Sequence, residues 1–303
     1  MLKSNLLIKP TKEIWWMEMS VGPSFLRQIG NYELEIFITG RDKLGVSRIG
    51  RGIIGIQNNI LKVEKIFHDP ILDIGPSGCF DENGVSYPWI IKHNNIEYMY
   101  YVGWVEGGKN RFQNFLGVAT KSFEQRDFKR EFNIPILDRT EEEPFGTGSC
   151  CVFQKKDEWA MLYTSFLPWK GELNANSIHP FSQPSYNIKT AFSKDLLNWK
   201  RTNLPLLDFK TNEYIHGKPV IFDDEKNIEL YFSVRGEAYR IGLAKGNNLN
   251  NLVRKKNLEF KNQKWISETQ EYAFPILINR VKYLFFNGNG YGRTGLGYTI
   301  LNK

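Results

Sequence analysis

The segment YELEIFITG (Tyr32–Gly40) indicates the fold, because versions of it return four more times along the chain. The later copies, each about 60 residues after the one before, are IEYMYYVGW (Ile96–Trp104), EWAMLYTSF (Glu158–Phe166), IELYFSVRG (Ile228–Gly236) and VKYLFFNGN (Val281–Asn289). All copies are dense in aromatic and β-branched residues, which favour β-strands. An apolar segment precedes each copy and a glycine-containing segment follows it, so the repeat unit is a small antiparallel sheet.

Repetition of one small sheet is typical of a β-propeller, in which the sheets pack around a central axis. We therefore predict an all-β fold, a five-bladed β-propeller with four antiparallel strands per blade. A single domain is expected over residues 1–303, since no linker interrupts the repeat. The blades are expected at residues 20–75, 80–135, 144–204, 213–258 and 268–301. The last blade lacks a fourth strand, so we expect residues 4–10 to pair there and close the ring.

The composition excludes several classes of protein. Hydrophobic residues make up 41% of the chain and aromatic residues 14%, which is enough for a large core. No window approaches the roughly 18 consecutive apolar residues of a membrane span. The net charge of +7 is scattered along the chain rather than gathered in one block, so we expect no nucleic-acid partner. These properties indicate no particular oligomeric state.

The N-terminal sequence and the cysteines indicate a cytoplasmic protein. The opening residues, MLKSNLLIKPTKE, lack the apolar core and the small-residue cleavage site of a secretory signal. Cys79, Cys150 and Cys151 are odd in number and two of them are adjacent, so we expect reduced thiols. No Cys-x-x-Cys or paired-histidine spacing indicates a metal site. We therefore expect neither a metal nor another cofactor.

Several phrases of this sequence resemble the five-bladed propellers of glycoside hydrolase families 32, 43 and 130. A still closer resemblance is to a group of uncharacterised bacterial glycosidase-like proteins. The phrases that carry the resemblance are TGRDKLGVSRIG (Thr39–Gly50), CFDENGVSYPWII (Cys79–Ile91), YNIKTAFSKDLLNW (Tyr186–Trp199), RGEAYRIGLAKG (Arg235–Gly246), EYAFPILI (Glu271–Ile278) and NGNGYGRTGLGY (Asn287–Tyr298). The resemblance implies carbohydrate chemistry in a pocket on the axis.

Acidic residues recur just ahead of the predicted inner strands, where several loops would converge. They are Glu18, Asp81, Glu143, Glu213, Glu268 and Glu271. Cleavage of a glycosidic bond needs one carboxyl group that protonates the leaving oxygen and a second that activates water or attacks the sugar. We predict Asp81, Glu271 and Glu213 as the catalytic residues. Alternatively, the Asp81 carboxylate caps the amides of its own turn.

A second set of polar and aromatic residues is predicted to bind the substrate. Arginines suit carboxylate or phosphate oxygens, while amide and tyrosine side chains suit sugar hydroxyls. The predicted binding residues are Glu18, Arg41, Asp42, Tyr186, Asn187, His216, Arg235, Asn287, Asn289, Tyr291 and Arg293. Lys218 belongs to the same basic set. A salt bridge within the sheet is the alternative role of each cation, and a structural hydrogen bond is that of His216.

The leading hypothesis for function is a glycoside hydrolase-like enzyme of carbohydrate metabolism that acts on a polysaccharide. The resemblance also implies an Asp at the start of the first blade, where this chain has MEMSVGPS (Met17–Ser24) and only Glu18 is acidic. That departure, together with the basic residues, motivates an alternative. The chain would then be a phosphorylase or glycosyltransferase that uses a phosphorylated or nucleotide-linked sugar in polysaccharide biosynthesis. A non-catalytic sugar-binding propeller is a third hypothesis.

Overall fold

The computed structural model describes residues 1–108, 110–125, 127–170, 183–223 and 227–301. Strands dominate these residues and helices are few and short, so the predicted all-β class is confirmed. The short helices are η1 (Trp15–Met17), η2 (Leu249–Asn251), η3 (Lys264–Ile266) and α1 (Asn289–Gly292). No helix of the described part is both long and apolar enough to cross a lipid bilayer.

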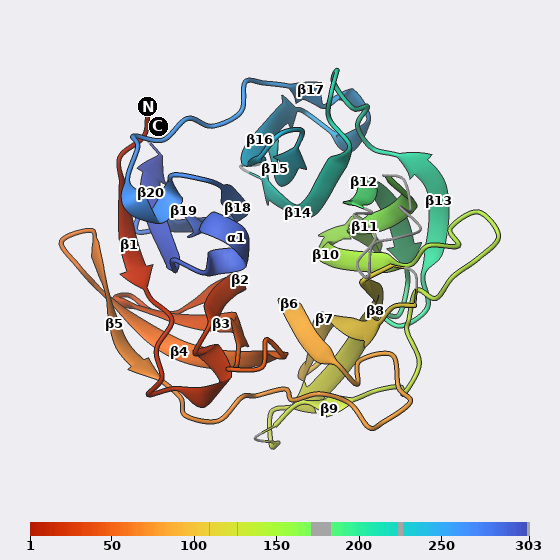
Figure 1. Cartoon of the computed structure of the whole chain (residues 1–303), viewed down its shortest axis with the longest axis horizontal. Coiled ribbons are helices and arrows are strands. Elements are labelled where there is room, and N and C mark those ends of the chain that lie inside the picture. Colours follow the sequence, from red (N-terminus) through yellow and green to blue (C-terminus); the bar gives the residue numbers. More distant parts are fainter. Residues whose placement is uncertain (109, 126, 171–182, 224–226, 302–303) are drawn as a thin grey trace, which may run out of the picture.

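Successive strands pair antiparallel with their neighbours in the chain and form groups around a common centre (Figure 1). From the centre outward, the first groups are β2 (Ser20–Gly30), β3 (Glu33–Arg41), β4 (Ser47–Gln57) and β5 (Ile60–Ile66), then β6 (Gly84–His93), β7 (Ile96–Glu106), β8 (Phe112–Ser122) and β9 (Lys129–Arg130). Next come β10 (Thr147–Lys155), β11 (Glu158–Lys170), β12 (Gln183–Ser193) and β13 (Lys200–Pro205), then β14 (Ile215–Asp223), β15 (Ile228–Arg235), β16 (Tyr239–Gly246) and β17 (Val253–Arg254). The remaining strands are β18 (Gln270–Ile278), β19 (Val281–Gly288), β20 (Leu296–Leu301) and β1 (Ser4–Ile8).

The N-terminal strand lies beside the C-terminal one, as expected. β1 pairs antiparallel with β20, with Ser4 opposite Thr299 and Leu6 opposite Gly297. The two chain ends therefore lie together at the rim (Figure 1). The hydrogen-bonded ladders do not divide into separate sheets of four strands throughout. Single parallel pairings join β4 to β6 and β12 to β14, so that two of the sheets contain eight strands.

The recurrent glycine of the third strand has a steric cause. In the β2–β5 group, a Cβ atom on Gly50 would lie 2.1 Å from the Trp16 ring. In the β6–β9 group, Gly117 faces Phe80 in the same way, and in the last group Gly297 faces Trp265. A large ring placed just ahead of the inner strand therefore packs on the backbone of the third strand, where only glycine leaves room.

Every inner strand also carries an irregularity near its start. The register shifts lie between Val21 and Ser24, Ser86 and Trp89, Thr147 and Cys150, Gly217 and Val220, and Glu271 and Phe274. Prolines occupy three of these bulges, at Pro23, Pro88 and Pro219, because a residue without an N–H group cannot complete the ladder. A bulge redirects a side chain away from the regular alternation of the strand. These bulges determine which residues face the centre of the molecule.

The packing of Trp16 on Gly50 gives a test of this architecture. Gly50→Ala places a methyl group on atoms of a fully buried ring, so we expect the free energy of unfolding to fall by about 1–3 kcal/mol. The matched control is Gly30→Ala, since a Cβ atom at Gly30 meets nothing nearer than 3.8 Å. Urea denaturation of both variants measures the difference. Equal stability of the two variants would contradict the proposed packing.

Candidate functional site

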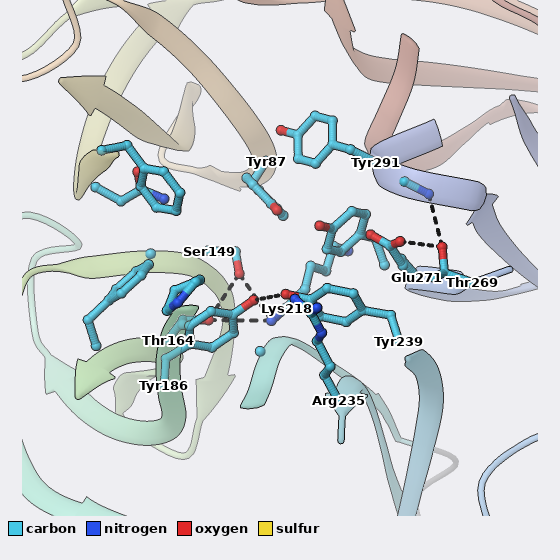
Figure 2. Close-up of a pocket in the computed structure, with 18 of the residues that line it drawn as sticks. Tyr87, Ser149, Thr164, Tyr186, Lys218, Arg235, Tyr239, Thr269, Glu271 and Tyr291 are labelled. Carbon is cyan, nitrogen blue, oxygen red and sulfur yellow. Dashed lines mark hydrogen bonds between the residues drawn. The ribbon is translucent and has the colours of Figure 1, made fainter. Parts of the chain in front are cut away.

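A cavity of about 730 Å³ opens where the starts of the inner strands converge. We call it the central cavity. Strands of several groups contribute to its wall, and the residues used below are Arg41, Tyr87, Trp104, Arg111, Phe112, Ser149, Thr164, Phe166, Tyr186, Lys218, Arg235, Glu237, Ala238, Tyr239, Glu268, Thr269, Glu271, Tyr272 and Tyr291. Figure 2 shows ten of them around one space. Most of these side chains are aromatic or cationic, and three are carboxylates.

Three of the lining residues that the inner-strand bulges supply have positive φ. Tyr87, Lys218 and Tyr272 occupy equivalent bulges and have φ values of +55°, +48° and +59°. Such backbone conformations are strained for residues with a side chain and persist only where the surroundings hold them. Neighbouring hydroxyl groups provide that restraint. The amide of Tyr87 donates to Thr39 Oγ1 at 3.0 Å, and that of Tyr272 donates to Ser233 Oγ at 2.9 Å.

The Lys218 bulge is held in the same manner. Its amide donates to Ser149 Oγ at 3.1 Å and to Thr164 Oγ1 at 3.3 Å (Figure 2). In each case the acceptor hydroxyl belongs to a strand of the preceding group, as Thr39, Thr164 and Ser233 lie on β3, β11 and β15. One contact therefore joins adjacent groups and orients a residue of the cavity.

Tyrosine rings form one wall of the central cavity. Tyr87, Tyr272 and Tyr291 pack edge to face, with ring centroids 5.2–5.9 Å apart. On the other side, the hydroxyl groups of Tyr186 and Tyr239 share a hydrogen bond of 2.8 Å. Burial raises the pKa of all these phenols, that of Tyr239 to about 12, so they remain neutral hydrogen-bonding groups. Rings with a polar edge suit a ligand that has both apolar and hydroxyl-bearing faces.

Glu271 is the buried carboxylate of the cavity. Its exposed fraction is 2%, and the Thr269 hydroxyl donates to its Oε1 at 2.5 Å (Figure 2). The Thr269 oxygen in turn accepts the amide of Gly290 at 3.0 Å. Burial raises the pKa of Glu271, although the Thr269 hydrogen bond and the nearby Arg235 charge oppose that rise. A carboxyl group in this environment retains its proton at higher pH than usual.

Four cations line the same cavity. Arg41 lies over the Tyr291 ring at 4.0 Å, Arg235 lies over the Tyr239 ring at 5.1 Å, and Arg111 and Lys218 complete the set. Lys218 is 3% exposed, and its ammonium donates only to the Ala273 carbonyl, at 3.4 Å, among the described residues. Burial lowers the pKa of Lys218 to about 7. The cavity thus combines one buried carboxyl group with an excess of positive charge.

The predicted residues fall into two sets. Those that line the central cavity are Arg41, Tyr186, Arg235, Glu271 and Tyr291. The others are Glu18, Asp42, Asp81, Asn187, Glu213, His216, Asn287, Asn289 and Arg293, none of which is among the described lining residues. Several members of the second set have partners in the protein that account for their positions. Their catalytic or binding roles stay predictions.

Asp81 lies in a buried ion pair. It is fully buried, and its Oδ2 accepts Arg130 Nε at 2.7 Å and the Tyr101 hydroxyl at 2.9 Å. Arg130 also donates to the Asp73 carbonyl. Because Arg130 lies on the outer strand β9, the pair connects the turn ahead of β6 to the rim of its group.

The next acidic residue repeats this arrangement. Glu143 is 1% exposed and accepts Tyr163 Oη at 2.8 Å and Arg201 Nη1 at 2.6 Å. Arg201 comes from the outer strand β13 and donates to the Asp138 carbonyl. These contacts match those of Asp81, so the recurrence of acidic residues has a structural component. The hydrogen bonds and charges of Lys189, Tyr163 and Arg201 lower the pKa of Glu143 although burial opposes them.

Glu213 forms the third version of the pair. Both of its oxygens accept Arg254 of the outer strand β17 at 3.1 Å, and Oε2 also lies 2.9 Å from His216 Nε2. The hydrogen bonds of Arg254 and His216 lower the pKa of Glu213 to about 2 against the effect of burial. Burial, assisted by the Arg254 charge, lowers the pKa of His216 to about 4. His216 is therefore a neutral, fully buried ring at neutral pH.

The remaining predicted residues lie outside the cavity, and several of them bond to neighbouring segments. Asp42 Oδ2 pairs with Arg48 at 2.6 Å, and Asn287 donates to the Val21 carbonyl. Asn289 Oδ1 accepts the amides of Glu268 and Thr269 at 2.8 and 3.2 Å. Arg293 pairs with Glu268 at 3.0 Å on the surface, Glu18 ends η1, and Asn187 is a buried residue of β12. The Asn289 contacts hold the segment that leads to Glu271.

Sequence reasoning missed Tyr87, Thr269, Tyr239 and Tyr272 as lining residues. A signal for Tyr87 was available, because Tyr87 and Lys218 each precede a proline at the same point of an inner strand. No comparable signal marks Tyr239, which reaches the cavity through packing of the β16 start against Tyr186. Among the described residues no group of three or more His, Cys, Asp and Glu side chains is suited to hold a metal ion.

Comparisons with known proteins support the fold. No protein-family model matches the chain. Two proteins of Mycobacterium tuberculosis, uncharacterized protein MT1551 of strain CDC 1551 / Oshkosh and uncharacterized protein Rv1502 of strain ATCC 25618 / H37Rv, are each 27% identical to it over 305 residues. Each alignment covers 99% of this chain and 99% of the relative. The likeness therefore extends along the whole of both proteins.

Solved structures with a similar fold are glycoside hydrolase-like propellers. One described as "Glycoside hydrolase" has a TM-score of 0.74 at 16% identity. The alignment covers 100% of this chain and 92% of the chain of that structure. Another has a TM-score of 0.68 at 15% identity, and the alignment covers 98% of this chain and 91% of that one. It is described as "The GH130 family of mannoside phosphorylases contains glycoside hydrolases that target beta-1,2 mannosidic linkages in Candida mannan". The Bombyx mori GH32 beta-fructofuranosidase has a TM-score of 0.65 at 14% identity, with 99% and 62% covered. The predicted resemblance to such propellers is confirmed for the fold.

The ion pair of Asp81 gives a test of its structural contribution. Arg130→Met leaves a fully buried carboxylate without its cation, so we expect the free energy of unfolding to fall by about 3–5 kcal/mol. Arg293→Met is the matched control, because the Arg293–Glu268 pair is exposed and should contribute less than about 1 kcal/mol. Urea denaturation compares the two variants. If the unfolding curves of the two variants coincide, the Asp81–Arg130 pair does not stabilise the fold.

Proposed function

We propose that the central cavity cleaves a glycosidic bond and that Glu271 donates the proton to the leaving oxygen. The observation that carries this proposal is a buried carboxyl group with a raised pKa in a cavity lined by tyrosines. A general acid must be protonated at the working pH, and burial is the usual means of achieving this. The propeller fold shared with glycoside hydrolases is consistent with such chemistry, although a fold alone does not specify function.

The walls of the cavity suit a sugar. Trp104 and Phe112 pack against each other with centroids 4.9 Å apart, and both line the cavity together with Phe166. Flat aromatic faces cover the C–H faces of a sugar ring, while neutral phenols and amide groups bind its hydroxyls. Stacking of this kind supplies contact area, and the few polar groups then set the orientation of the bond to be cleaved.

In the hydrolytic form of this proposal a second carboxylate activates water. Glu237 and Glu268 are the other carboxylates that line the cavity. We propose that one of them acts as this base, while Asp81 and Glu213 hold the strand groups together through Arg130 and Arg254. This assignment revises the expected pairing of Asp81 with Glu271 or Glu213, because an arginine-paired carboxylate outside the cavity does not reach its ligand.

Phosphorolysis is the second candidate, favoured by the cations Arg41, Arg111, Lys218 and Arg235. Phosphate is already ionised and attacks the sugar without a carboxylate base, whereas arginine and lysine side chains would position its oxygens. A structure with this fold is described as belonging to a family of mannoside phosphorylases that contains hydrolases. Either reaction uses the same proton from Glu271, so the two differ in the nucleophile and in the need for a carboxylate base.

We also propose that residues 1–303 form a single five-bladed propeller domain, closed by the pairing of β1 with β20. The successive strand groups and the adjacent chain ends support this interpretation (Figure 1). Closure of this kind would leave no open sheet edge beside the site.

Glu271→Gln tests the proposed proton donor. The amide has the same shape but cannot donate a proton, so kcat on an aryl glycoside or oligosaccharide substrate should fall by about 10²–10⁴-fold. The melting temperature should stay close to that of the wild type. The assay is run with and without inorganic phosphate, and release of a free sugar in both conditions is expected for hydrolysis. Formation of a sugar phosphate would instead identify phosphorolysis, and full activity of the variant would exclude Glu271 as the acid.

The pH dependence gives an independent test. Glu271 acts while protonated, so kcat should fall as the pH rises through its raised pKa. Thr269→Val removes a hydrogen bond that favours the ionised carboxylate of Glu271. The fall of kcat at alkaline pH should therefore move to higher pH in this variant. Thr120→Val is the matched control, because Thr120 donates to Glu131 at 2.9 Å on the surface. If kcat of the Thr269 variant falls at the same pH as kcat of the wild type, Glu271 is excluded as the titrating group.

A further inference from the structure

A second set of hollows continues outward from the central cavity. A hollow of about 270 Å³ shares Glu237 and Ala238 with the central cavity. The same hollow shares Glu213, Arg240 and Asn257 with a larger one of about 640 Å³. Because hollows that share lining residues are neighbours, the three follow one another outward from the central cavity. We call the two outer hollows together the outer groove.

The outer groove is basic. Lys210, Arg240, Lys256 and Lys261 line it, and none of these cations forms an ion pair with a described carboxylate. The acidic lining residues are Glu213, Glu237 and Glu259. The Glu213 charge is already compensated by Arg254. Positive charge therefore exceeds negative charge along the groove, and the three lysines are exposed to solvent.

Arg240 lies at the junction of the groove and the central cavity. Its Nη1 donates to the carbonyls of Tyr239 and Glu268, at 2.8 Å each. Tyr239 and Glu268 both line the central cavity, so Arg240 connects β16 to the segment ahead of β18. These two bonds orient the guanidinium, whose other nitrogens remain available to an anionic group of a ligand.

We propose that the outer groove binds the non-reacting part of an acidic polysaccharide whose end occupies the central cavity. This inference rests on the proposed function and specifies its substrate class, a glycan that carries carboxylates along its chain. The sugar at the end would contact the tyrosines and Glu271, while sugars farther along would meet Arg240, Lys256 and Lys261. Binding energy from these distant units would position the reacting bond.

An acidic glycan fits the path better than a nucleic acid does. Proteins that bind single-stranded nucleic acids combine a basic groove with aromatic rings on which successive bases stack. In the described part of the outer groove the aromatic lining is limited to Phe260. The aromatic residues are instead concentrated in the central cavity, where one or a few sugar units would bind. A polyanion that stacks only at its end matches this distribution.

Binding measurements on the Glu271→Gln protein test this proposal without turnover. The probes are an oligogalacturonate, a neutral dextran oligosaccharide of equal length, and single-stranded DNA of equal charge. Isothermal titration calorimetry measures the binding of each probe. In the Lys256→Glu/Lys261→Glu variant we expect oligogalacturonate to bind at least tenfold more weakly. Binding should also weaken as the salt concentration rises, because exposed charges are screened.

The matched control is Lys155→Glu/Lys156→Glu, which changes the net charge equally at an exposed turn that lines neither the central cavity nor the groove. Its affinity for oligogalacturonate should stay within twofold of the parent. An equal loss in both variants, or equally tight binding of dextran, would overturn the proposal. Tighter, groove-dependent binding of DNA would overturn it in favour of a nucleic-acid site. If Glu271→Gln is fully active and oligogalacturonate still binds the groove, only the role of Glu271 as the acid is overturned.

Discussion

The structure depends on the restraint of the inner-strand bulges by hydroxyl groups of the preceding strand group. Each of these contacts joins two neighbouring groups, and three of them hold a residue with positive φ at the centre. Without the restraint, Tyr87, Lys218 and Tyr272 would return to ordinary strand geometry and point elsewhere. The architecture and the candidate site are therefore not separable, because the contacts that hold the groups together also aim the side chains. Strain of this kind is common where a protein must present a group precisely.

The distribution of charge follows from where each acidic residue can find a cation. Asp81, Glu143 and Glu213 precede inner strands whose outer strands carry Arg130, Arg201 and Arg254, and each forms a buried pair. Glu271 does not occupy the same position, because it lies within the inner strand β18 and lines the central cavity. Its carboxyl group accepts the Thr269 hydroxyl, and burial raises its pKa. The position ahead of the inner strand thus carries structural carboxylates in three groups, whereas the last group places a buried carboxyl group in the cavity wall.

In the proposed function, the central cavity and the outer groove bind different parts of one ligand. The cavity is aromatic and holds the buried acid, which suits one or a few sugar units and a reacting bond. The groove is open and basic, which suits a longer anionic chain held by weak, salt-sensitive contacts.

Local periodicity and composition were enough to predict the all-β class, the strand repeat and the pairing of the N-terminal strand with the last one. Five of the residues predicted from the sequence, Glu271, Arg41, Arg235, Tyr186 and Tyr291, line the central cavity, while their catalytic or binding roles stay predictions. Tertiary structure decided which acidic residues are paired and which one faces the cavity, because Arg130, Arg201 and Arg254 lie 41–58 residues away from their partners. It likewise decided the aromatic wall, the positive-φ bulges and the outer groove. These features arise where strand groups meet, and no spacing along one chain segment encodes such contacts.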